Sequence, residues 1–238
     1  MRYPGGKGKI YQRIINLMPP HRIYVESHLG GGAVLRHKQP APLNIGIDID
    51  PRPLRAFSDY GQSYKFICAD AIVALKGLRA SPETLIYADP PYLPSTRRAE
   101  RVYRRDYSEE DHVRLLSSLR ALPCMVMISG YPNGLYDEML DGWNRESFTA
   151  ASQVGLREEA VWMNFQPRVL HDTSFIGDTF RDRGASVQKR RRWRERFGGM
   201  EKPHQQAVLT DLVSDFMSDL PEAERERMAD ILLKGGRP

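Results

Sequence analysis

Long apolar stretches are missing from this chain, and so is an apolar segment at its N-terminus. No run of 18 apolar residues occurs among its 238 residues. A helix that spans a membrane needs about 20 predominantly apolar residues, and a secretory signal needs an apolar core. The sequence therefore predicts a soluble, cytoplasmic protein with no membrane partner.

Cysteine is also scarce, with only Cys68 and Cys124 present. Two cysteines cannot build a disulfide framework, and neither has the neighbours or spacing of a metal site. We expect no bound metal. We also expect both thiols to lie in the core, because each falls in a predicted buried strand. Internal repeats and low-complexity tracts are absent too.

The chain does have enough apolar material for one sizeable core, since 41% of its residues are hydrophobic. Helical patterns cover 10–18 and 108–122, and Ser108 is the expected N-cap of the second. The predicted strands are 23–25, 44–47, 65–68, 85–88, 125–129, 144–149 and 161–164. Strands that alternate with helices predict an α/β fold with a mostly parallel, doubly wound sheet.

The most informative stretch is Asp89-Pro90-Pro91-Tyr92, directly after the apolar run 84–88. Pro90 must end this strand because proline cannot donate to a sheet ladder, and Pro91 biases Pro90 away from helical geometry. The stretch therefore leaves the sheet as an extended bend at its carboxyl edge, where open α/β folds bind ligands. A carboxylate, backbone carbonyls and a flat ring suit recognition of a planar ring that bears an amine. A strand followed by a proline turn with an aspartate cap is the alternative interpretation.

A glycine-rich loop, residues 27–32, follows an earlier short strand. Glycines let the backbone approach a ligand where any Cβ would collide, and the run 33–35 then opens a helix whose N-terminus faces the site. Asp48 ends the second strand about 20 residues further on, where Rossmann-type units place the acid that binds ribose hydroxyls. Of Asp48 and Asp50, one is expected to be an ordinary cap after a strand.

Together with residues 2–7 and 67–71, these stretches resemble the motifs of a known family, in the family's order. The family is the Dam-like, alpha-group DNA adenine-N6 methyltransferases, which include many phage and prophage enzymes. The resemblance covers roughly residues 2–165. It implies a Rossmann-like methyltransferase fold with a mostly parallel seven-stranded sheet, an antiparallel last strand within 159–164, and S-adenosylmethionine as cofactor.

The resemblance also implies roles for individual residues. Asp48 would bind the ribose, Asp70 the cofactor adenine, and Asp89 both the methionine amine and the target base. Glu26 would support the glycine loop. The implied cofactor-binding residues are Tyr3, Gly5, Gly6, Lys7, Glu26, His28, Gly30, Gly32, Asp48, Asp70, Ala71 and Asp89, and the implied catalytic residues are Asp89, Pro90 and Tyr92.

Two features of the motifs needed a second interpretation. Where the family has a Phe beside the cofactor, this chain has Ser27 and His28; the histidine can still stack, or it is a partly exposed loop residue. The stretch 5–9 is similar to a phosphate loop, but it follows no buried strand and lacks the final Ser or Thr. We therefore exclude a nucleotide triphosphatase.

The net charge of +5 comes from clustered basic residues interleaved with aromatic ones. This composition is typical of phosphate contact plus stacking, although solvated surfaces or, for the second cluster, an oligomer contact would have it too. The predicted nucleic-acid-binding residues are Arg97, Arg98, Arg101, Arg104, Arg105, Lys189, Arg190 and Arg191. Only residues 71–88 separate the third motif from Asp89, too few for a target-recognition domain. We therefore expect relaxed sequence preference on DNA.

After Asn164 the chain changes character, so we predict a catalytic domain over 1–165 and a helical extension over 166–238. A basic helix is expected at 186–197, and two amphipathic, mostly acidic helices at 205–220 and 221–233. The first carries an apolar stripe that must be buried on the catalytic domain or on another subunit, so a homo-oligomer is one expectation. Its members are Leu209, Leu212, Val213, Phe216 and Met217.

The predicted function is methyl transfer from S-adenosylmethionine to adenine N6 in DNA by direct displacement. The target base must be flipped out or unpaired. Asp89 and the Pro90 carbonyl would accept hydrogen bonds from the amine and favour its developing positive charge, while Tyr92 stacks on the ring. RNA adenine and cytosine N4 are chemical variants, and a non-catalytic nucleic-acid-binding protein is the alternative. The dipeptide Pro123-Cys124 is typical of cytosine-C5 methylation, but it begins a strand, so we take it as coincidence.

Overall fold

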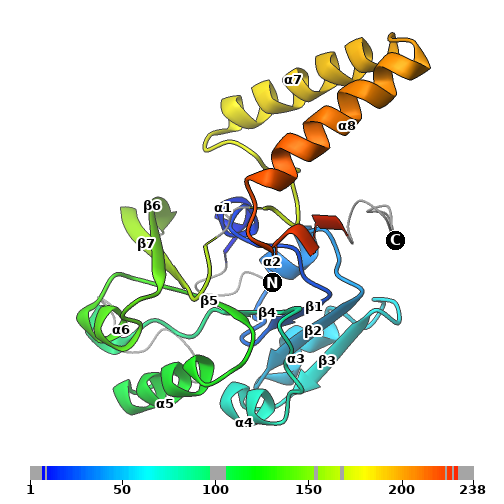
Figure 1. The fold of residues 1–238 in the computed structure, drawn as a ribbon. Coiled ribbons are helices and arrows are strands. Elements are labelled where there is room, and N and C mark those ends of the chain that lie inside the picture. The colour runs from blue at the N-terminus through cyan, green and yellow to red at the C-terminus, as the bar shows by residue number, and fades with distance from the viewer. Residues whose placement is uncertain are drawn as a thin grey trace.

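The computed structural model describes residues 7–8, 10–96, 106–152, 155–166, 169–222, 224–226 and 228–229. Its centre is a seven-stranded sheet in the order β3-β2-β1-β4-β5-β7-β6 (Figure 1). The strands are β1 (Ile23–Glu26), β2 (Leu43–Asp48), β3 (Tyr64–Cys68), β4 (Thr84–Ala88), β5 (Met125–Gly130), β6 (Asn144–Ser152) and β7 (Gly155–Met163). The helices are α1 (Tyr11–Ile15), α2 (Ala33–His37), α3 (Pro51–Arg55), α4 (Ala71–Lys76), α5 (Glu109–Arg120), α6 (Gly134–Met139), α7 (Phe180–Gly198) and α8 (Lys202–Ser218), with a short 3₁₀ turn at Pro94–Thr96.

The strand directions confirm the predicted Rossmann-like methyltransferase fold. Strands β1 to β5 pair in parallel, whereas β7 lies antiparallel to both β5 and β6. The expected antiparallel strand within 159–164 is therefore β7. All the predicted strands exist, and the boundaries of several are extended by one or more residues.

Alternate residues of the buried strands face two apolar cores, one on each side of the sheet. On one side Tyr24, Leu85 and Met127 pack with α1 and α2. On the other side Ile86 and Ile128 pack with α4, α5 and α6. Helices cover both faces of the sheet. Polar side chains that could contact a ligand are therefore expected at the ends of the strands.

The α5 and α7 N-termini show what local signals could predict. Ser108 caps α5 in a capping box with Asp111, as the sequence indicated. Helix α7 was expected from residue 186 but begins at Phe180, because Thr179 and Asp182 form a second capping box. The glycine at position 184 had hidden this start, since glycine weakens a helical pattern.

The segment after β7 first packs on the sheet-containing part of the chain and then leaves it. The His171 amide donates to the Met18 carbonyl at 2.8 Å, and Asp172 Oδ2 accepts from the Gln39 amide at 2.8 Å. Asp172 is 2% exposed. Beyond this anchor, α7 and α8 form a hairpin that stands away from the sheet (Figure 1), and neither helix contains a buried residue.

The structure contradicts one expectation about burial and removes one of two alternatives for another. Cys68 is exposed, while Cys124 is buried, because β3 is the edge strand of the sheet. The apolar stripe of α8 is not covered by the catalytic domain: Leu209 is 55% exposed and Leu212 58%. Burial of this stripe on another subunit, the other alternative, stays a prediction.

Candidate active site

Four acidic residues meet at the carboxyl edge of the sheet. Glu26 and Asp48 end β1 and β2, Asp89 directly follows β4, and Asp70 is the second residue after β3. The parallel pairing of these adjacent strands brings their ends together. Because β1 has β2 on one side and β4 on the other, the winding of the sheet reverses there. Open α/β folds bind ligands at such a point.

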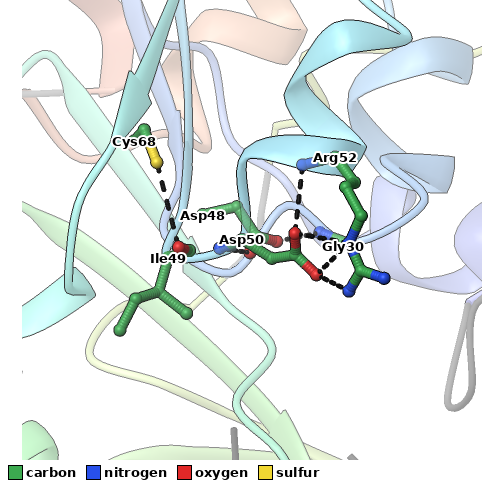
Figure 2. A network of polar contacts seen from close by, with 6 residues as sticks. All are labelled: Gly30, Asp48, Ile49, Asp50, Arg52 and Cys68. Carbon is green, nitrogen blue, oxygen red and sulfur yellow. Dashed lines mark hydrogen bonds and ion pairs between the residues drawn. The ribbon is translucent and has the colours of Figure 1, made fainter. Parts of the chain in front are cut away.

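Asp48 clamps the glycine-rich loop to the end of β2 (Figure 2). Its Oδ2 accepts from the Gly30 amide at 2.8 Å, and its Oδ1 accepts from the Asp50 amide at 2.8 Å. Burial raises the pKa of Asp48, and the two amide hydrogen bonds oppose that rise. The carboxylate is thus held in one orientation at the edge of the sheet.

Asp50 has the capping role that was expected of one residue in this pair. Its side chain accepts from the Arg52 amide at 3.0 Å as the N-cap of α3, and it forms an ion pair with the Arg52 guanidinium (Figure 2). The prediction that one of the two aspartates is an ordinary cap is confirmed. Asp48 is left as the residue that faces the loop.

Gly32 is required by packing. Its φ is +61°, and a Cβ at this position would lie 2.3 Å from Phe57 Cζ. Phe57 is 1% exposed and belongs to the core. The missing side chain therefore makes room for Phe57, rather than for a ligand as the sequence had indicated. Whether the Gly32 backbone also contacts the cofactor stays a prediction.

Gly32→Ala is expected to lower the free energy of unfolding by about 2–4 kcal/mol, from the left-handed backbone and the overlap with Phe57. The measurement is urea unfolding followed by circular dichroism. Gly134→Ala is the matched control, because a Cβ there meets nothing within 4 Å; it should change stability by less than about 1 kcal/mol. Equal stability of the two variants would contradict this account of the loop.

Asp89 is fixed by two donors on one oxygen. Lys7 Nζ lies 2.8 Å from Asp89 Oδ1, and Ser129 Oγ donates to the same atom at 3.0 Å. Tyr87 and Ser129 share a further hydrogen bond of 2.9 Å between their hydroxyls. Asp89 remains 18% exposed, so the carboxylate is held through Oδ1 and is still partly open to solvent.

Tyr92 is engaged through its hydroxyl and through one ring face. Its hydroxyl donates to Glu159 Oε1 at 2.6 Å and accepts from Lys7 Nζ at 2.8 Å. Its ring stacks on Tyr131, with 4.0 Å between centroids and 15° between planes. The Arg157 guanidinium lies 5.0 Å from the Tyr131 ring on β7's side of the site. The Lys7 ammonium also lies over the Tyr92 ring, 4.7 Å from its centroid.

Glu159 completes a buried charged cluster that the sequence did not predict. Its Oε2 lies 3.5 Å from Lys7 Nζ, and the two side chains are 7% and 4% exposed. Burial opposes the charge of Lys7, but attraction to Asp89, Tyr92 and Glu159 raises the pKa of Lys7 well above its usual value. Burial raises the pKa of Glu159, while Lys7 and Tyr92 oppose that rise. The sequence signal for this buried carboxylate was its position directly before the apolar run 160–163.

His28 and Asp70 are also held by their neighbours. His28 contacts Ser27 Oγ through Nδ1 at 2.9 Å and the Tyr107 hydroxyl through Nε2 at 3.0 Å. Burial lowers the pKa of His28 to about 3, so the ring is neutral. Asp70 caps α4 by accepting from the Val73 amide at 3.1 Å, and the predicted cofactor residue Ala71 is the buried first residue of that helix.

Glu26 is buried behind the loop. Its Oε2 accepts from the Tyr24 hydroxyl and from the Leu35 amide, each at 2.9 Å. Burial raises the pKa of Glu26 to about 8, opposed by these hydrogen bonds. The residue therefore ties β1 to α2, which fits the expected support of the glycine loop.

Exposed apolar side chains border Asp48, and the sequence reasoning missed them. Ile49 is 41% exposed and Ile67 is 40% exposed. The Ile49 carbonyl lies 3.8 Å from Cys68 Sγ, and its side chain points away from the Asp48 carboxylate (Figure 2). The position of Ile49 between Asp48 and Asp50, at the end of a strand, is the sequence signal that could have predicted this exposed side chain.

Several predicted residues fall elsewhere. Tyr3, Gly5 and Gly6, and the cluster of Arg97, Arg98, Arg101, Arg104 and Arg105, lie outside the described residues. Lys189, Arg190 and Arg191 are exposed on α7, in the hairpin that stands away from the sheet (Figure 1). Within the described ranges, no group of three His, Cys, Asp or Glu side chains has the arrangement of a metal site. Nor does any described helix combine the length and apolar character that a membrane crossing requires.

Solved structures with a similar fold include several methyltransferases. An rRNA methylase from Streptococcus thermophilus is 15% identical, with a TM-score of 0.44 over 65% of this chain and 93% of that chain. An O-methyltransferase from Streptomyces achromogenes, in complex with S-adenosylmethionine, is 13% identical, with a TM-score of 0.45 over 66% and 78%. A dimethyladenosine transferase from Plasmodium falciparum is 15% identical, with a TM-score of 0.43 over 68% and 63%. No protein-family model and no curated protein sequence match the chain. The likeness concerns the fold alone.

Proposed function

We propose that this protein is an S-adenosylmethionine-dependent methyltransferase that acts on adenine N6 in nucleic acid, with DNA as the substrate. The observation that carries the proposal is the position of Asp89. Its carboxylate lies at the end of β4, on the strand next to β1, where Ser129 orients it and it is partly exposed. Tyr92 lies three residues on, with its ring at the same edge.

The carboxyl ends of β1 to β3 suit the proposed cofactor. Asp48, already oriented by two amides, has lone pairs left for ribose hydroxyls. The exposed side chain of Ile49 offers an apolar surface for a flat adenine ring. Asp89 and Glu159 carry two negative charges against the single charge of Lys7, which favours a cationic sulfonium. S-adenosylmethionine would supply an electrophilic methyl group at this place.

The residues of the β4 end suit the acceptor amine. Adenine N6 is a poor nucleophile because its lone pair is delocalised into the ring. Hydrogen bonds from its two N–H groups to Asp89 and to the Pro90 carbonyl would localise that lone pair and stabilise the positive charge that develops on nitrogen. The Tyr92 ring would hold the base by stacking, and the Asp89 carboxylate would accept one amine proton.

Helix α7 supports a polyanionic substrate. Its exposed basic residues are Arg181, Lys189, Arg190, Arg191, Arg192, Arg194 and Arg196, and Trp193 among them is 56% exposed. The ion pair of Arg191 with Glu195 is exposed at both ends. Such pairs contribute little and leave the charge available to a partner. We therefore place phosphate contacts on this helix.

Removing the charges of Lys189, Arg190 and Arg191 together by alanine substitution is expected to weaken DNA binding for all sequences. The salt dependence of the binding constant should fall by about one unit per lost phosphate contact. Fluorescence anisotropy at several salt concentrations measures both quantities. The matched control removes three exposed charges elsewhere, at Lys65, Lys76 and Arg79. Equal effects of the two triple variants would show that α7 acts only through net charge.

The proposed function is tested by incubating the protein with methyl-labelled S-adenosylmethionine and unmethylated DNA or RNA of mixed sequence. Nucleoside analysis should find N6-methyladenine in DNA, and mapping should place it in many sequence contexts, since no target-recognition domain precedes Asp89. Labelled RNA adenine or cytosine N4 would instead establish one of the chemical variants. Cofactor-independent nucleic-acid binding without any transfer would overturn the proposal in favour of a binding protein.

A further inference from the structure

The Lys7 ammonium lies between two carboxylates at the candidate active site. It is 2.8 Å from Asp89 Oδ1 and 3.5 Å from Glu159 Oε2, and the Tyr92 hydroxyl contacts both Lys7 and Glu159. These side chains come from the N-terminal segment, the end of β4 and strand β7. An arrangement of one cation and two anions leaves the cluster with a net charge of −1 when all three are ionised.

This arrangement conflicts with the role that the proposed function gives to Asp89. The carboxylate must accept a hydrogen bond from the target amine and oppose the positive charge that develops there. An ammonium bound to the same carboxylate competes for its oxygen and cancels its charge. Movement of Lys7 away from Asp89 when the amine arrives would relieve this competition.

Glu159 can receive Lys7 at small cost. Its Oε1 is held by Tyr92 at 2.6 Å, while its buried Oε2 accepts no hydrogen bond from the described part of the chain. The Lys7 nitrogen needs to move only about 0.7 Å closer to Oε2 to reach the 2.8 Å of a charged hydrogen bond. A buried acceptor without a donor costs free energy, so the second position of the ammonium satisfies an atom that the first leaves unpaired.

We propose that Glu159 is a positioning residue that takes the Lys7 ammonium from Asp89 when the acceptor amine binds. The inference rests on the proposed function. With Lys7 held on Glu159, the ammonium no longer donates a short hydrogen bond to Asp89, and the Asp89 carboxylate opposes the charge of the amine more strongly. Tyr92, which contacts both partners, keeps the ammonium in place during the exchange.

The test is a double-mutant cycle on methyl transfer with Glu159→Gln and Lys7→Met. Glu159→Gln leaves Lys7 on Asp89, so kcat should fall roughly tenfold or more, while the cofactor KM stays within about twofold. In the Lys7→Met background no ammonium needs a second site, so adding Glu159→Gln should change kcat by less than about threefold. Circular dichroism and urea unfolding establish that each variant is folded.

Glu158→Gln is the matched control for the glutamate. Glu158 precedes Glu159 on β7 and is 57% exposed, with Arg145 at 3.8 Å on the other face of the strand. Its loss should leave kcat unchanged within about twofold. Additive effects of Glu159→Gln and Lys7→Met, or equal effects at positions 158 and 159, would overturn the inference.

A second measurement needs no substrate and separates the inference from the proposed function. Carbon-13 NMR of the Glu159 carboxyl across a pH titration should show a higher pKa of Glu159 in Lys7→Met than in the wild type, because the buried carboxylate then loses the cation that lowers it. An unchanged titration of Glu159 in Lys7→Met would overturn the pairing even if the enzyme is active. Absence of any methyl transfer by the wild type would instead reject the proposed function, while the NMR result still decides whether Glu159 depends on Lys7.

Discussion

Asp89→Ala is expected to abolish methyl transfer, by at least about a thousandfold in kcat, while the protein stays folded. The change removes the acceptor that the amine needs in the transition state. It also removes the partner that holds Lys7 at 2.8 Å, so Lys7 should move fully to Glu159. Single-turnover transfer of labelled methyl groups to DNA measures the effect.

Two further variants provide the comparison for the effect of Asp89→Ala on methyl transfer. Ser129→Ala removes one of the two donors to Asp89 Oδ1 but leaves the carboxylate, so its effect should be much smaller. Asp59→Ala removes an exposed surface carboxylate and should leave transfer unchanged. If Asp89→Ala keeps transfer within a few-fold of wild type, the catalytic assignment of Asp89 is wrong.

The second large effect is expected at Asp48. Asp48→Ala should weaken S-adenosylmethionine binding by roughly a hundredfold or more, because a charged hydrogen-bond acceptor is worth about 1.5–3 kcal/mol and the loop loses its clamp as well. The amides of Gly30 and Asp50 both lose their acceptor. Calorimetric titration measures the cofactor affinity, and anisotropy should find a smaller effect on DNA binding.

Asp50→Asn provides the comparison for Asp48. Asparagine is as good an N-cap as aspartate, so α3 should keep its cap while the pair with Arg52 loses its charge. Cofactor affinity should change little. If Asp48→Ala leaves the affinity unchanged, another group holds the ribose, and the assignment from the end of the second strand fails.

Local patterns were enough to predict the sheet and the acidic edge. Apolar runs marked the strands, and aspartates at the ends of β2 and β4 followed from chain position alone. Local pattern alone could not separate the roles of Asp48 and Asp50, since both lie at the end of the same strand and either could cap α3, and only the family resemblance favoured Asp48 as the ribose ligand. The structure decides this through the amide contacts of each carboxylate.

What the sequence could not predict depends on contacts between distant segments. Glu159 and Lys7 are 152 residues apart, and no local pattern links them. The exposure of Cys68 depends on β3 being an edge strand, which follows from strand order and not from the strand itself. Gly32 looked like a ligand contact because its constraint, the Phe57 ring, lies 25 residues away in the chain.

The position of β7 has a consequence for the protein during its synthesis. This strand lies between β5 and β6, although it is made after both. A growing chain that has reached β6 still has β5 as an open edge, and open edges pair readily with other chains. When residues 155–163 have left the ribosome, β7 can pair with β5. The same pairing covers the open edge and brings Glu159 next to Lys7. Nascent chains should therefore gain protection from aggregation and a complete charged cluster together.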